Sequence, residues 1–221
     1  MPGCLNYPDV CNQMLSTSHI EFAYDATNRF RFPDINCRKG EQCLIMGPSG
    51  CGKTTLLHLM AGLLHPDNGQ VCINDVDITQ TTPTQTDRIR GKEIGIIFQK
   101  AHFIQSLSVM ENVLIVRYLN RMKEDVEEVI QLLDQLNIAH KARSRPNELS
   151  QGELQRLSIA RALINRPSVI LADEPTSSLD DGHCEEVIAL LRDQTEATQV
   201  ALIIVTHDVR LSSVFKNVIR L

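Results

Sequence analysis

The fold is decided by the segment GPSGCGKT, which comprises Gly47, Pro48, Ser49, Gly50, Cys51, Gly52, Lys53 and Thr54. It fits the pattern G-x-x-x-x-G-K-[ST], in which glycines let backbone N–H groups close around phosphate oxygens. Apolar residues 43–46 predict a buried strand before it, and residues 54–61 predict a helix after it. The positive end of that helix attracts an anion. The segment therefore predicts a nucleoside triphosphate site; the alternative is a glycine-rich turn with a solvated lysine.

Two side chains at the end of this segment and one just after it suit a triphosphate and its metal ion. Lys53 supplies a mobile positive charge for the β- and γ-phosphates, and the hydroxyl of Thr54 is a ligand for Mg²⁺. Thr55 follows in the first turn of the predicted helix and is expected to contribute to nucleotide binding.

Composition limits the classes of protein that the chain can belong to. The 221 residues carry 27 acidic and 22 basic side chains, and no basic stripe is present, so we expect no nucleic-acid partner. The basic cluster at Lys141, Arg143 and Arg145 is interpreted as a solvated face. The longest apolar run, residues 200–205, is too short to cross a bilayer, so a membrane role requires a partner protein.

Cysteine usage and the N-terminus indicate the compartment. The seven cysteines contain no C-x-x-C pair, which predicts reduced thiols in a cytosolic protein. No Lys or Arg precedes Arg29 and no apolar stretch stands at the start, so we predict no secretory signal. Residues 1–18 are expected to form a poorly ordered extension.

Apolar periodicity separates an α/β core from a helical lobe. Between residues 101 and 166 the pattern is helical, with capping boxes formed by Ser108 with Glu111 and by Ser150 with Glu153. Residues 19–100 and 167–221 are expected to form the core, with a parallel sheet and the nucleotide at its carboxyl edge. Strands are predicted over residues 19–24, 30–37, 70–73, 93–99, 169–172 and 200–205.

Polar residues follow several predicted core strands. Asp173 and Glu174 end a buried strand, so one can hold Mg²⁺ and the other can take a proton from water; we assign Asp173 to the metal and Glu174 to the general base. The alternative for either residue is an ordinary helix N-cap. Gln99 is expected to position water or Mg²⁺, and His207 to donate to a γ-oxygen. Either residue alone is more often structural.

In this order the motifs resemble those of the ABC-type ATPases over about residues 19–221. The matching set is the phosphate loop, Gln99, LSQGE at 149–153, residues 169–174, SLD at 178–180 and His207. The resemblance implies an α/β P-loop NTPase fold: a RecA-like parallel sheet core, an N-terminal antiparallel β subdomain and an inserted α-helical lobe.

The resemblance also implies ATP hydrolysis between two copies of the chain, a homodimer or a paired cassette, with ATP and Mg²⁺ as cofactors. Ser150 and Gly152 of one copy would contact the γ-phosphate bound by the other, and Asp180 would lie beside the nucleotide. Tyr24 resembles the aromatic residue that stacks on adenine; an ordinary strand aromatic is the alternative.

Three residues depart from the family pattern. Gln151 replaces a glycine and Glu153 replaces a glutamine in the family's LSGGQ segment. Glu153 keeps the capping box, but its charge is expected to oppose the partner's triphosphate. Cys51 stands where many relatives have Ser or Ala, so it is either a small residue of no special role or an oxidisable thiol.

Residues 99–113, 145–150 and 172–177 resemble ATPase subunits of the lipoprotein-release, macrolide-export and cell-division group. That resemblance implies a chain at the inner face of the cell membrane, coupled to an integral membrane subunit. The apolar residues of 101–109 are expected to dock that subunit or, alternatively, to pack the base of the lobe. A regulatory ABC ATPase that signals to an envelope or division complex is the other functional alternative. Only 50 residues separate Gln99 from Ser150, which excludes the coiled-coil ABC proteins.

Overall fold

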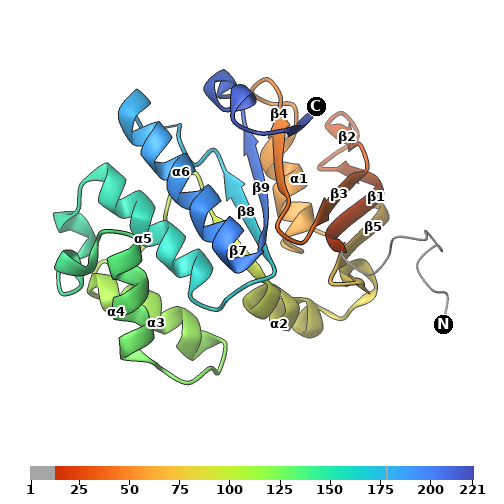
Figure 1. Cartoon of the computed structure of the whole chain (residues 1–221). Coiled ribbons are helices and arrows are strands. Elements are labelled where there is room, and N and C mark those ends of the chain that lie inside the picture. The colour runs from red at the N-terminus through yellow and green to blue at the C-terminus, as the bar shows by residue number, and fades with distance from the viewer. Residues whose placement is uncertain (1–12, 178) are drawn as a thin grey trace.

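The computed structural model describes residues 13–177 and 179–221 (Figure 1). The structure contains an antiparallel sheet and a parallel sheet, and helices pack on both faces of the parallel sheet. In chain order the elements are β1 (Gln13–Ala23), β2 (Arg29–Arg31), β3 (Ile35–Arg38), β4 (Gln42–Met46), α1 (Lys53–Met60), β5 (Asn68–Ile73), β6 (Val76–Asp77), α2 (Pro83–Glu93), β7 (Ile94–Ile97), α3 (Val109–Leu119), α4 (Val126–Gln135), α5 (Gln151–Leu163), β8 (Val169–Asp173), α6 (Asp181–Thr198), β9 (Ala201–Thr206) and β10 (Asn217–Arg220).

A parallel sheet forms the centre of the molecule, as predicted. Its strand order is β10-β4-β9-β8-β7, and all four pairings are parallel. Every residue of β9 is buried, and alternate side chains serve two different cores. Leu202 and Ile204 face α5 and α6, whereas Ile203 and Val205 face α1. Burial on both faces explains why this strand is continuously apolar in sequence.

An antiparallel sheet of β1, β2, β3, β5 and β6 covers the α1 side of the parallel sheet. It stands at the opposite end of the molecule from α3 and α4 (Figure 1). Leu15 and Ile20 of β1 pack into one core with Leu56 and Met60 of α1. This packing fixes α1, and hence the phosphate loop before it, between the two sheets.

Strand β1 corrects the predicted extension over residues 1–18. It begins at Gln13, where Leu15 and Thr17 are buried and pair with β3 and β5. At His19, whose φ is 50°, the register shifts, so the next buried residue is Ile20 rather than His19. The shift breaks the two-residue alternation, which concealed the first half of the strand. Residues 1–12 lie outside the described part of the chain.

Helices α3, α4 and α5 all fall within residues 101–166, the span predicted to be helical. Both predicted capping boxes are confirmed: Ser108 accepts from the Glu111 N–H, and Ser150 accepts from the Glu153 N–H. Their apolar faces meet α6 and the parallel sheet in a single buried core. No helix in the described residues is long and apolar enough to span a membrane.

Three elements were not predicted: α2, β6 and β10, of which β6 is only two residues long. The strand predicted over residues 30–37 is interrupted at residues 32–34, so it forms β2 and β3 instead. Helix α2 buries no residue, so its sequence has no apolar periodicity; its start is marked by a capping box of Thr82 with Gln85 and by Pro83 at the first position. Strand β10 is four residues long and only partly buried at the sheet edge beside β4.

Candidate active site

The phosphate loop joins β4 to α1 in the conformation that its glycines allow. Gly50 and Gly52 have φ of 83° and 96°, in the region that other residues avoid. A Cβ on Gly52 would come within 2.7 Å of the Phe30 ring, so glycine is also required there by space. A Cβ on Gly47 would lie 2.5 Å from Cys51 Sγ, which places that half-buried thiol against the loop's own backbone.

The ammonium group of Lys53 is held inside this loop. Lys53 Nζ donates to the carbonyl oxygens of Gly47 and Pro48 at 2.9 and 3.0 Å. It also lies 3.7 Å from Glu174 Oε1, and both side chains are less than a tenth exposed. The charge is therefore desolvated but paired, and it faces the space that the loop encloses.

Thr54 and Asp173 form a pair suited to a magnesium ion. Thr54 Oγ1 donates to Asp173 Oδ2 at 2.9 Å, while Asp173 Oδ1 is buried and has no hydrogen-bond partner within the described residues. Burial raises the pKa of Asp173 above its ordinary value, although the hydrogen bond from Thr54 opposes this rise. A buried carboxylate oxygen without a partner is costly, and a cation would satisfy it. These residues therefore fit the predicted metal site, in which Mg²⁺ takes few protein ligands and keeps phosphate and water oxygens.

Glu174 is fixed in a strained position at the end of β8. Its φ is 48°, and it is 7% exposed. Thr206 Oγ1 donates to its Oε2 at 2.8 Å, and His207 Nδ1 lies 2.7 Å from its Oε1. Backbone strain of this kind is found where the surrounding structure imposes a functional geometry. Thr206 was not identified from the sequence; its position directly before His207, at the end of β9, was the available signal.

The structure brings part of the phosphate loop together with Gln99, Glu174 and His207 in a single cleft of about 270 Å³. Gln99, exposed just after β7, faces this cleft together with Glu174 and His207. The lining residues are Phe30, Ser49, Gly50, Gly52, Lys53, Thr54, Thr55, Gln99, Glu174 and His207. Asp173 lies directly behind Thr54.

Tyr24 lies at the margin of this cleft. Its hydroxyl is 3.3 Å from Thr55 Oγ1, its side chain is 57% exposed, and its ring makes edge contacts with Phe22 and Phe30. An exposed ring beside the loop suits adenine stacking, and the two edge contacts equally suit a strand aromatic. The stacking role stays a prediction.

Ser150, Gly152 and Asp180 do not line the cleft that holds Lys53. Ser150 caps α5, and Asp180 caps α6 by accepting from the His183 N–H at 3.0 Å. The structure therefore places these predicted nucleotide contacts on a separate surface of the same chain. Ser178 lies outside the described residues.

The charge of Glu153 has partners that the sequence did not indicate. Glu153 Oε2 accepts the Ser150 N–H at 2.8 Å, and Oε1 lies 3.4 Å from His140 Nε2 and 3.7 Å from Lys141 Nζ. The Ser150 backbone hydrogen bond lowers the pKa of this carboxyl. Lys141 is thus not only part of a solvated face, because its ammonium group lies beside the carboxylate of Glu153.

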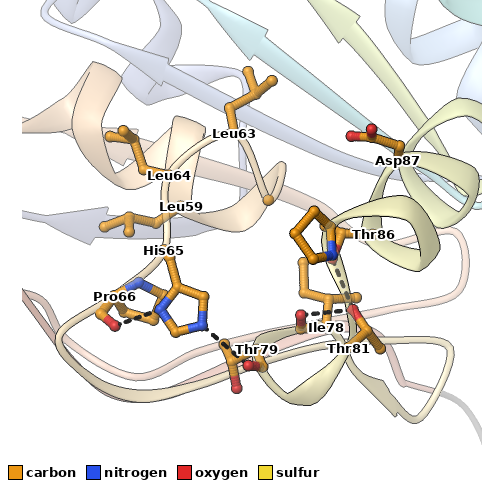
Figure 2. Close-up of a pocket in the computed structure, with 12 residues that line it drawn as sticks. Leu59, Leu63, Leu64, His65, Pro66, Ile78, Thr79, Thr81, Thr86 and Asp87 are labelled. Atoms are coloured by element: carbon orange, nitrogen blue, oxygen red, sulfur yellow. Dashed lines mark hydrogen bonds between the residues drawn. The ribbon is translucent and has the colours of Figure 1, made fainter.

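A second hollow, of about 400 Å³, lies between the end of α1 and α2 and contains none of the predicted site residues. Figure 2 shows the His65 ring spanning its floor, with Nδ1 2.9 Å from the Pro66 carbonyl oxygen and Nε2 3.0 Å from that of Thr79. This ring ties the loop after α1 to the segment after β6.

Comparisons with known proteins agree with this geometry. A family model described as ABC transporter matches residues 32–177. The chain is 39% identical over 183 residues to the lipoprotein-releasing system ATP-binding protein LolD of Colwellia psychrerythraea, covering 81% of this chain and 70% of that one. It is 35% identical to the macrolide export ATP-binding/permease protein MacB of Rhodopirellula baltica, covering 85% of this chain and 28% of that one.

A solved structure has the same fold. The dimeric structure of MJ0796, described as a bacterial ABC transporter cassette, superposes with a TM-score of 0.84 at 30% identity and covers 94% of both chains. The family match and the identities confirm the predicted P-loop NTPase fold and the resemblance on which it rested. The chain belongs to the ABC transporter family, as an ATP-binding and ATP-hydrolysing subunit in the group of the lipoprotein-release and macrolide-export proteins.

Proposed function

We propose that two copies of this chain enclose two ATP molecules and hydrolyse them to drive a separate integral membrane subunit. The observation that carries this proposal is the separation of two half-sites on one chain. Lys53, Thr54, Glu174 and His207 line the cleft, whereas Ser150 and Gly152 lie elsewhere. A second copy brings its Ser150 surface to the first copy's cleft, and the dimeric arrangement of MJ0796 supports this.

Within one half-site each side chain has a distinct task. Lys53 binds the β- and γ-phosphates, and Thr54, Asp173 and Gln99 would hold Mg²⁺, which neutralises charge on the phosphate oxygens when bound. Glu174 takes the proton of the water that attacks the γ-phosphate, yielding ADP and phosphate. Thr206 orients the carboxylate of Glu174, and His207, whose Nδ1 lies 2.7 Å from that carboxylate, is proposed to donate to an oxygen of the γ-phosphate.

The rate of ATP hydrolysis per chain is expected to rise with protein concentration, because half of each site is supplied by another copy. The measurement is the ATPase rate from nanomolar protein upward, alongside the molecular mass in solution at each concentration. A constant rate per chain from a protein that remains monomeric throughout would contradict the composite site.

A groove of about 520 Å³ between α2, α3 and α5 is proposed to dock the membrane subunit. It contains exposed apolar side chains, including Leu63, Phe98 and Leu119, at 42%, 38% and 72% exposure. Its wall carries Ser158 Oγ of α5 and Asn165 Oδ1 just after that helix, which are buried and have no hydrogen-bond partner within the described residues. A segment of the membrane subunit that carries both apolar and polar groups would cover the exposed apolar side chains and form hydrogen bonds with the two buried polar atoms.

The segment predicted to dock divides into two parts. Phe103 is half-buried against the core and lies 5.6 Å beneath the Arg161 guanidinium, so it packs the lobe. Ile104 is 42% exposed, and its backbone is held by Asn112, which accepts the Ile104 N–H at 3.0 Å. Ile104 rather than Phe103 therefore remains the candidate anchor from this segment.

Leu119→Asp and Ile104→Asp are each expected to abolish or strongly reduce co-purification with the membrane subunit. Leu119→Asp places a charge in the groove, and Ile104→Asp places one on the exposed segment before α3. ATPase activity of the isolated chain should be unchanged. Val76→Asp, at 45% exposure on β6, is the matched control for an added surface charge. Equal recovery of the partner with all three variants would contradict the assigned groove.

The transported or released molecule is proposed to be a lipoprotein, by similarity to the LolD proteins. The test is to purify the chain with its membrane subunit and measure ATP-dependent release of lipoprotein from vesicles. An ATPase that regulates an envelope complex without such release is the other outcome of the same experiment.

A further inference from the structure

His183 lies between the N-terminus of α5 and that of its own helix, α6. His183 lies in the first turn of α6, and a Cβ on Gly152 would be only 3.5 Å from His183 Cδ2. Its ring Nδ1 is 2.9 Å from both carboxylate oxygens of Asp180. The side chain thus lies between two of the residues expected to meet the partner's nucleotide.

One turn further along, an ion pair keeps the same two helices together. Arg156 Nη2 of α5 lies 2.9 Å from Glu186 Oε2 of α6, and Arg156 Nη1 also donates to the Leu136 carbonyl oxygen at 3.2 Å. The contact between Gly152 and His183 is therefore supported by a neighbouring link between the helices.

The charged groups around His183 favour its protonated form. The Asp180 hydrogen bond, with its charge, raises the pKa of His183 above the ordinary value of 6.5; Glu186 raises it further and Arg156 lowers it. His183 is also exposed, so its ring can meet a second molecule.

We infer that His183 is a positioning residue that links Gly152 to Asp180 and, when protonated, favours closure of the ATP-bound dimer. The inference rests on the proposed composite site. A triphosphate arriving at this face brings several negative charges, whereas Asp180 and Glu153 on the same surface are acidic. An imidazolium ring held on Asp180 offsets that carboxylate and attracts the triphosphate.

The sign of the pH dependence follows from proton linkage. Because the partner's triphosphate raises the pKa of His183 further, the dimer binds this proton more tightly than the monomer does. Its contribution to dimerisation is complete below the monomer pKa and is lost as pH rises through the dimer pKa. Since the monomer pKa already lies above 6.5, the loss falls on the alkaline side of that value.

The test measures the dimerisation constant with ATP in the Glu174→Gln background, in which hydrolysis is expected to be slow, from about pH 6 to 9. His183→Gln should weaken the dimer at low pH by about two- to fivefold, the range of exposed charge interactions. It should also remove the part of the pH dependence that His183 contributes. His183→Arg keeps a positive charge and should hold the dimer tight up to pH 9. His19→Gln, at an exposed position of β1 away from α5 and α6, is the matched control and should keep the original profile.

The outcomes separate this inference from the function beneath it. An ATP-dependent dimer whose pH profile is the same with His183, Gln and Arg would overturn the role of His183 alone. No ATP-dependent dimer in any variant would overturn the composite site itself. A change in profile with His19→Gln equal to that with His183→Gln would show that the pH dependence does not come from His183.

Discussion

Replacement of Glu174 by Gln is expected to slow ATP hydrolysis by about 10²–10⁴-fold, the usual contribution of a positioned general base. Glutamine has the same shape and its Oε1 can still accept from Thr206, so the strained backbone at this position is retained. It cannot take a proton from water. ATP binding should persist, and the ATP-bound dimer should accumulate and elute earlier from a sizing column.

Two controls distinguish the loss of the general base from a general effect of the substitution or a loss of the fold. Glu127→Gln, at an exposed position of α4, removes a carboxylate of the same chemistry far from the cleft and should leave turnover unchanged. The unfolding temperature of each variant reports whether the fold is intact. Normal turnover in a folded Glu174→Gln protein would show that another group, or water alone, accepts the proton.

The central sheet was predictable because burial leaves a direct mark on the sequence. Strand β8 is buried throughout and reads as an apolar run that ends in Asp173. Strand β1 was only half predicted, because the register shift at His19 depends on pairing with β5, which is distant in sequence. Helix α2 buries nothing, so no apolar period could reveal it.

The site was predictable to the extent that it is built from the ends of strands. Gln99, Asp173, Glu174 and His207 each follow or end a strand of one parallel sheet, whose carboxyl ends share an edge. The partners of these groups were not predictable, since they depend on three-dimensional contacts. Lys141 beside Glu153 belongs to this class, because no local pattern joins two residues on different elements.

Replacement of Lys53 by Ala is expected to weaken ATP binding by about 10²-fold or more, because it removes a desolvated charge that faces the β- and γ-phosphates. In the structure this ammonium is shared between the carbonyl oxygens of Gly47 and Pro48 and the carboxylate of Glu174. A triphosphate presents stronger acceptors at the same place, so Lys53 is already positioned for it. The affinity can be measured by calorimetric titration with ATP.

The same substitution also leaves Glu174 buried without its cation, so loss of binding must be separated from loss of structure. Lys53→Met keeps most of the buried volume without the charge and should bind ATP as weakly as Lys53→Ala. Lys92→Ala, at 79% side-chain exposure, is the matched control for removal of a lysine and should bind ATP normally. If the Lys53→Met protein unfolds at the normal temperature yet binds ATP with unchanged affinity, the charge is not what holds the triphosphate. Backbone N–H groups of the loop would then account for binding on their own.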